Sequence, residues 1–83
     1  MKVTIRYFAS IREAIGQGSE SRETAALTLA GLRDELLAAS PVHAASLARG
    51  RAVRMAVDQV MRDETAALHE GCEVAFFPPV TGG

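Results

Sequence analysis

The sequence has few of the residues that support covalent cross-links. Its single cysteine, Cys72, excludes a disulfide within the chain. Lys2 is the only lysine, and the other eight basic residues are arginines, so few ammonium groups are present to accept an isopeptide bond. No apolar run approaches the length of a membrane span, and no signal peptide precedes the first strand pattern. We therefore expect a soluble, cytoplasmic protein.

The charges show no excess of either sign. Nine Lys and Arg residues face ten Asp and Glu residues, which gives a formal net charge of -1. Without a basic stripe or a polybasic segment, we expect neither a nucleic-acid partner nor a membrane partner. With 83 residues, 48% of them apolar, the chain has room for one domain with a modest core.

The usual signs of an active site are missing as well. No glycine-rich loop follows a strand and opens a helix, so nothing would cradle a phosphate. His43 and His69 do not have the spacing of zinc ligands and are interpreted as solvated loop or helix-end residues. Cys72 is interpreted as a small buried apolar residue, with a reactive thiol as the alternative. We predict no metal site and no bound cofactor.

Alternating polar and apolar side chains predict most of the strands. The pattern is clear at 2–7, 53–58 and 72–77 and weaker at 20–27, which is predicted as an edge strand. Residues 59–62 fit a short strand or a bend. Because the first and last strands have the same inward periodicity, we expect them to lie side by side.

One main helix is predicted after Thr28, whose hydroxyl can accept a hydrogen bond from the first helical turn. Leucines at helical spacing form one apolar stripe: Leu29, Leu32, Leu36 and Leu37. Pro41 ends this helix near Ser40. A short helix is predicted at 43–49 and a helical turn at 11–15. One long helix packed on a four- or five-stranded mixed sheet makes an α+β two-layer fold.

Three apolar side chains lie at positions that the alternation predicts to be exposed to solvent. Phe8 follows Arg6 on the outward side of the first strand, Phe77 lies on the outward side of the last, and Met61 belongs to the short segment between. Single exposed apolar residues are ordinary, but three on one side of a small sheet indicate a docking patch. Scattered surface or core positions are the alternative.

The end of the sequence is its most specific feature. Two prolines without an N–H stop the last strand, so 1–77 is predicted as the domain and 78–83 as an extended, flexible tail. Glycines without a Cβ let a narrow channel close around the backbone. We predict that Gly83 carries the reactive carboxylate, and an ordinary frayed terminus is the alternative. The residues predicted to thread a partner's channel are Pro78, Pro79, Val80, Thr81 and Gly82.

Together these residues resemble the small sulfur-carrier subunits of molybdopterin synthase, which are ubiquitin-like β-grasp proteins. The resemblance rests on Tyr7-Phe8-Ala9, Arg12-Glu13, Gly16, Thr28, Val57-Asp58-Gln59, Leu68, Gly71, Glu73-Val74-Ala75-Phe76-Phe77-Pro78-Pro79-Val80 and Gly82-Gly83. Asp58 stands where the family commonly has Asn, and Cys72 where it commonly has an acidic residue. Neither departure touches the tail.

The resemblance implies a co-substrate whose catalytic groups lie on its partners. A ubiquitin-activating-like adenylyltransferase uses ATP to adenylate Gly83, and a sulfur donor, such as a cysteine desulfurase or a rhodanese-like protein, converts it to a thiocarboxylate. The carrier then docks on the large subunit, in a heterotetramer of two large and two small subunits, and gives sulfur to cyclic pyranopterin monophosphate. Family contacts carry over onto Phe8, Met61 and Phe77.

Three other functions stay open from the sequence. A sulfur carrier for thiamine synthesis or for tRNA thiolation would have the same kind of tail. A protein-conjugating ubiquitin-like modifier would form isopeptide adducts instead. A plain interaction module would not depend on Gly82 and Gly83 at all.

Overall fold

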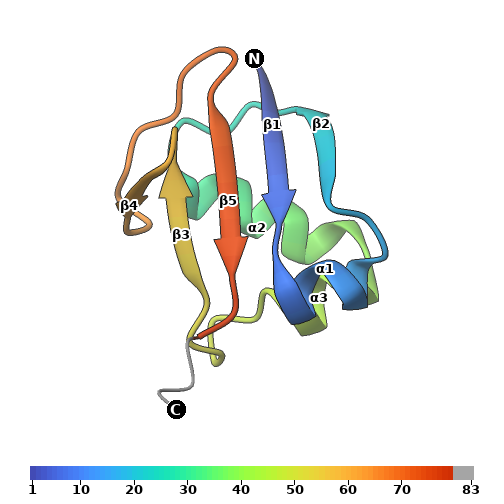
Figure 1. Ribbon diagram of the computed structural model, residues 1–83. Coiled ribbons are helices and arrows are strands. Elements are labelled where there is room, and N and C mark those ends of the chain that lie inside the picture. The colour runs from blue at the N-terminus through green and yellow to red at the C-terminus, as the bar shows by residue number, and fades with distance from the viewer. Residues whose placement is uncertain (80–83) are drawn as a thin grey trace.

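The computed structural model describes residues 1–79 and places five strands in one sheet with the helices on a single face (Figure 1). The elements are β1 (Lys2–Tyr7), α1 (Ala9–Ile15), β2 (Ser19–Glu23), α2 (Leu29–Ala39), α3 (Pro41–Ser46), β3 (Arg54–Val57), β4 (Val60–Arg62) and β5 (Glu73–Phe77). This confirms the predicted α+β plan. The predictions made for Val80, Thr81, Gly82 and Gly83 lie outside the described residues.

The strand order is β2-β1-β5-β3-β4, with β1 and β5 parallel at the centre and the other pairs antiparallel. The expected pairing of the first and last strands is therefore confirmed. The order also puts the polar strand β2 at an edge, as its poor alternation predicted. One face of the sheet packs on α2, and Figure 1 looks onto the opposite, open face.

The core lies between α2 and the inward side of the sheet. The leucine stripe of α2 meets the inward side chains of β1 and β5, and the fully buried members include Val3, Ile5, Tyr7, Leu29, Leu32, Leu36, Val74 and Phe76. Burial of such side chains stabilises a fold by about 1.5–3 kcal/mol each. Leu68 is tucked under the loop between β4 and β5, as expected, and Cys72 is fully buried in the core.

The helix ends follow the capping chemistry of the sequence. The Thr28 hydroxyl accepts from the Gly31 N–H at 3.3 Å. Ser40 both ends α2 and caps α3, because its hydroxyl accepts from the His43 N–H at 3.1 Å. The predicted range 43–49 was therefore displaced: Pro41 occupies the first turn of α3, where its missing N–H costs nothing.

His43 is a helix-end residue, in the last turn of α3, as one of the two interpretations had it, but it is not solvated. Its half-buried ring packs edge-on against Tyr7 with centroids 6.0 Å apart. Its Nδ1 lies 2.7 Å from the Ser40 hydroxyl, and its Nε2 lies 3.5 Å from a Glu20 carboxylate oxygen. Burial, and then the Glu20 charge, raise the pKa of Tyr7. This cluster fastens α3 to the edge of the sheet.

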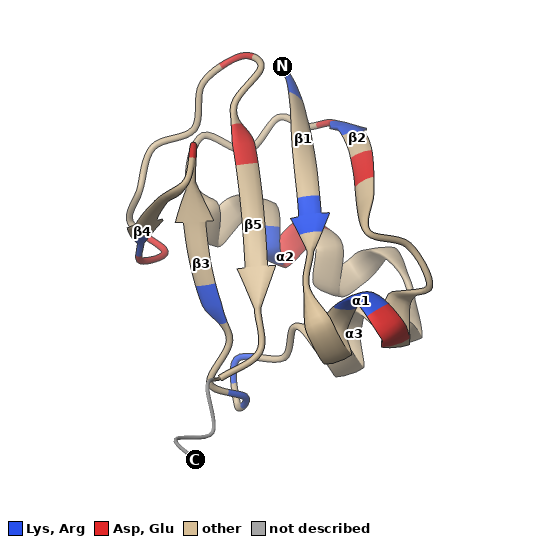
Figure 2. Ribbon diagram, in the orientation of Figure 1, with Lys and Arg blue, Asp and Glu red and all other residues tan. Residues whose placement is uncertain are grey.

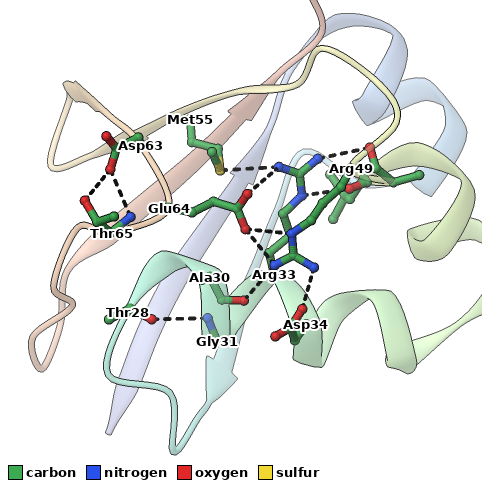
Figure 3. A network of polar contacts seen from close by, with 12 residues as sticks. Thr28, Ala30, Gly31, Arg33, Asp34, Arg49, Met55, Asp63, Glu64 and Thr65 are labelled. Atoms are coloured by element: carbon green, nitrogen blue, oxygen red, sulfur yellow. Dashed lines mark hydrogen bonds and ion pairs between the residues drawn. The ribbon is translucent and has the colours of Figure 1, made fainter.

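A buried arginine ties together segments that are distant in sequence (Figure 3). Arg33 of α2 is 3% exposed, and its guanidinium donates to the carbonyls of Leu47 at 2.8 Å and Ala48 at 3.0 Å. Glu64, in the loop after β4, lies 3.7 Å from Arg33 and also pairs with Arg49 at 2.6 Å. The chain leading into β3 is thereby held against α2.

Candidate functional site at the end of strand β5

The candidate site is built where the last strand stops. Phe77 is the final residue of β5 and is paired with Arg54 of β3. Pro78 and Pro79 follow outside the strand, because a residue without an N–H cannot extend the ladder. The site therefore lies at the edge of the sheet where β5 ends and β3 begins.

Phe8 and Phe77 lie against each other beside this edge. Their rings stack with centroids 4.7 Å apart and an interplanar angle of 13°. The sequence placed Phe8 on the outward side of the first strand. In the structure β1 ends at Tyr7, and Phe8 is the N-cap of α1. Both rings are half-buried, and the Arg6 guanidinium lies 5.2 Å from the centre of the Phe8 ring.

Met61 reaches the same region from β4. Its side chain is 52% exposed, and it lines a small hollow of about 180 Å³ with Arg54, Phe77 and Pro78. The sheet thus gathers the three apolar residues that the sequence singled out. We call Phe8, Met61 and Phe77 the apolar patch.

A second hollow lies on the other side of Pro78. This groove of about 520 Å³ runs between α1 and the loop before β3, and its lining includes Ser10, Arg51, Val53, Pro78 and Pro79. No local sequence pattern predicts this groove, because its walls come from three separate segments. Arg51, which lines this groove, was not among the residues that the sequence singled out.

The acidic segment of β5 and the basic segment of β3 lie at opposite ends of these two neighbouring strands, whereas β1 is basic near both of its ends (Figure 2). Arg51 and Arg54 are exposed at the end where β5 stops. At the other end, Asp58 accepts from the Glu73 N–H at 2.9 Å and lies 2.7 Å from His69. The hydrogen bond from the Glu73 N–H is the largest cause that lowers the pKa of Asp58, and the hydrogen bond with His69 is the second. Asp58 in turn raises the pKa of His69.

Comparison with known proteins adds the family. A family model described as the ThiS family matches residues 5–83. The chain belongs to the ThiS family. Its sequence is 39% identical over 83 residues to the molybdopterin synthase sulfur carrier subunit of Escherichia coli, covering 98% of this chain and 99% of that protein.

Solved structures share the fold of this ThiS-family chain. SAMP1 of Haloferax volcanii, a small archaeal modifier protein, matches with a TM-score of 0.79 at 22% identity and covers 100% of both chains. A second match is one chain of the complex between subunits 1 and 2 of the molybdopterin-converting factor of Helicobacter pylori. It has a TM-score of 0.72 and 24% identity, and the match covers 100% of this chain and 100% of that chain. These matches confirm the ubiquitin-like α+β fold.

Among residues 1–79, no group of three or more His, Cys, Asp or Glu side chains is placed to hold a metal ion. Cys72 is fully buried, in keeping with a small core residue. Within the same residues, no helix is both long and apolar enough to cross a membrane. What the site does offer is an apolar patch and two hollows around the base of the tail.

Proposed function

We propose that this chain is the sulfur carrier of molybdenum cofactor biosynthesis. The observation that carries the proposal is the match to the E. coli sulfur carrier subunit along nearly the whole of both chains. The apolar patch at the base of Pro78 and Pro79 supports it, because a carrier must dock before its tail can reach a partner's active site.

The proposed chemistry begins at the Gly83 carboxylate. A carboxylate has a pKa of about 3.5, so it is ionised at neutral pH and is a poor electrophile. In an activating enzyme, one carboxylate oxygen attacks the α-phosphorus of ATP and pyrophosphate leaves. The terminal sulfur of a persulfide on a donor protein, such as a cysteine desulfurase or a rhodanese-like protein, then displaces AMP and leaves Gly83 joined to the donor as an acyl disulfide. A second thiol attacks the donor-side sulfur of the S–S bond, which releases the thiocarboxylate and leaves a disulfide on the donor side.

The second half of the proposed reaction takes place on the large subunit. The thiocarboxylate sulfur attacks a carbon of cyclic pyranopterin monophosphate and displaces an oxygen leaving group from it. Water then cleaves the bond between the sulfur and the acyl carbon of Gly83, which leaves the sulfur on the pterin and returns Gly83 to a carboxylate. Two transfers supply both sulfurs of the dithiolene. Docking through the apolar patch raises the effective concentration of the sulfur at the acceptor. We expect two carriers and two large subunits in the working complex.

Intact-mass analysis tests the chemistry. The chain is incubated with the activating enzyme, ATP and a sulfur source, and we expect the mass change of one oxygen-for-sulfur exchange at Gly83. A variant lacking Gly82 and Gly83 should keep its docking affinity and lose sulfur transfer altogether. Full transfer by that variant, or an unmodified mass in the complete reaction, would rule the mechanism out.

Docking is tested through Met61, which can be changed without disturbing the core. Placing a charge in the apolar patch with Met61→Glu should weaken binding to the large subunit by about 10-fold or more. Leu27→Glu is the matched control, because Leu27 is 72% exposed and precedes α2, away from the patch. Isothermal titration calorimetry measures both affinities, and equal losses in the two variants would argue against the patch.

The likeness to SAMP1 makes protein conjugation the second candidate. Conjugation predicts isopeptide adducts on target lysines, which appear as slower bands that resist reductant. A carrier for thiamine or tRNA thiolation is separated genetically: we expect rescue of a strain deficient in molybdenum cofactor and no rescue of a thiamine auxotroph.

A further inference from the structure

Two arginines bracket the first residue of the tail. Pro78 lines both hollows, and each hollow has one arginine in its wall: Arg51 in the groove beside α1, and Arg54 in the hollow shared with Met61. A protein that closes around Pro78 and Pro79 must therefore approach a guanidinium on either side. We call Arg51 and Arg54 the basic collar.

Both arginines of the basic collar are available to a partner. Each is exposed, and neither forms an ion pair with any residue of the described range 1–79. Arg49, only two residues before Arg51, instead bonds to Asp34 at 2.5 Å and to Glu64 at 2.6 Å. The fold thus neutralises one of the three neighbouring arginines and leaves the other two facing solvent.

The local charge differs from the charge of the whole chain. The strand register places Glu73 at the start of β5 and Phe77 at its end, about 13 Å apart at 3.3 Å per residue. Asp58 lies beside Glu73, at the far end of β3 from Arg54. Both of these carboxylates therefore lie farther from the basic collar than a Debye length of about 8 Å at physiological salt. Asp63 is nearer, because it lines a shallow hollow with Arg54, but its carboxylate accepts hydrogen bonds from Thr65 and forms no ion pair with Arg54.

We infer that the basic collar docks on a ring of carboxylates around the mouth of the channel in the large subunit that receives the tail. The inference rests on the proposed function and names the chemistry of its partner surface. A planar guanidinium matches a carboxylate with two parallel hydrogen bonds, which fixes orientation as well as position.

Rim charges of this kind act mainly on the rate of association. Opposite charges steer two proteins together, and salt screens the effect, whereas an apolar patch that becomes buried in the interface contributes mostly to the dissociation rate. Arg54→Glu and Arg51→Glu should therefore each slow association with the large subunit by about 5-fold at low salt. At about 0.5 M salt the difference from the wild type should shrink to less than about 2-fold.

The test is stopped-flow measurement of association between the full chain and its large subunit at several salt concentrations. Lys2→Glu is the matched control, because it makes the same change in net charge at the other end of β1 and should leave the association rate within about 2-fold of the wild type. Thermal unfolding of each variant checks that it is folded. If Arg54→Glu does not fold, Arg51→Glu alone carries the test, because Arg51 lies in a loop.

Three outcomes would overturn the inference while leaving the proposed function intact. In the first, Arg51→Glu and Arg54→Glu associate with the large subunit as fast as the wild type. In the second, Lys2→Glu slows this association equally. In the third, the collar variants are impaired only in binding the activating enzyme. If the wild-type chain neither binds the large subunit nor acquires sulfur, the proposed function itself fails. A salt-dependent slowing confined to the collar variants supports the inference.

Discussion

Asp58 combines a left-handed backbone conformation with a side chain that contacts both Glu73 and His69. Its backbone is left-handed, with φ of 49°, which Asp and Asn tolerate better than most residues. Its carboxylate accepts from the Glu73 N–H at 2.9 Å and lies 2.7 Å from Nε2 of His69. The family's common Asn would keep the backbone conformation and the first bond. The ion pair with His69 is therefore what Asp adds in this chain.

This ion pair makes stability depend on pH in a definite direction. Because the pKa of His69 is raised in the folded state, its contribution to folding stability is complete below about pH 6.5. That contribution is lost as the pH rises through the pKa of the folded state. The lowered pKa of Asp58 means that its contribution is complete above about pH 3.9 and is lost as the pH falls through the folded value. The pair contributes most between these limits.

We predict that Asp58→Asn returns the pKa of His69 to about 6.5, its ordinary value. The hydrogen bond that the His69 ring donates to the Asp58 carboxylate is the main cause of the raised pKa, so its loss should remove most of the shift. An NMR titration of the His69 ring protons measures the change. Glu73→Gln is the control, and a pKa that moves equally in both variants would contradict the assignment.

The β3–β4 hairpin shows how a short element can form under local strain. Only Asp58 and Gln59 separate the two strands, and both have positive φ, 49° and 68°. This is the geometry of a type I′ turn, whose twist matches that of the strands and whose preferred sequences are Asn-Gly and Asp-Gly. Asp58 suits the first position, whereas Gln59 has a Cβ where glycine is favoured.

Gln59→Gly should stabilise the protein by about 0.5 kcal/mol. Relief of the left-handed strain, about 1 kcal/mol, outweighs the larger conformational entropy that glycine has in the unfolded chain. Urea unfolding measures the gain as a higher midpoint at an unchanged slope. Gln59→Ala keeps the Cβ and should bring no gain. An equal gain in both variants would mean that strain is not the cause.

Arg33 connects four parts of the fold that local sequence signals do not relate. It extends from α2 to the carbonyls after α3, to Glu64 after β4 and, at 4.0 Å, to the sulfur of Met55 in β3 (Figure 3). Burial is the main cause that lowers its pKa, with Glu64 opposing. A buried cation is tolerated here because backbone carbonyls and a carboxylate surround it.

Arg33→Met should destabilise the whole domain by about 2–3 kcal/mol. Methionine fills similar space, but the carbonyls of Leu47 and Ala48 lose their donors. Arg49→Met, at an exposed position of the same network, should cost clearly less. Denaturant unfolding of both variants compares them. If Arg33→Met were as stable as the wild type, the network would contribute packing alone.

Local patterns in the sequence determined the elements. The alternation at 2–7 and 72–77 requires strands that are buried on one side, and Thr28 with the leucine stripe requires a capped amphipathic helix. Two prolines after Phe77 require the ladder to stop. Each of these signals depends on neighbours a few residues apart, so each is visible without a structure. The boundaries of α3 were missed because Pro41 both ends one helix and begins the next.

Only the tertiary structure decided what those elements bring together. The inward periodicity predicted that β1 and β5 pair, but it did not predict that this pairing stacks the ring of Phe8 on that of Phe77. The ring of His43 is half-buried by Tyr7, and Arg33 is buried by the loop after α3, through contacts that no local pattern encodes. The sequence by itself determined a β-grasp body and the stop of its last strand. Packing between distant segments decided which side chains surround the point where the tail begins.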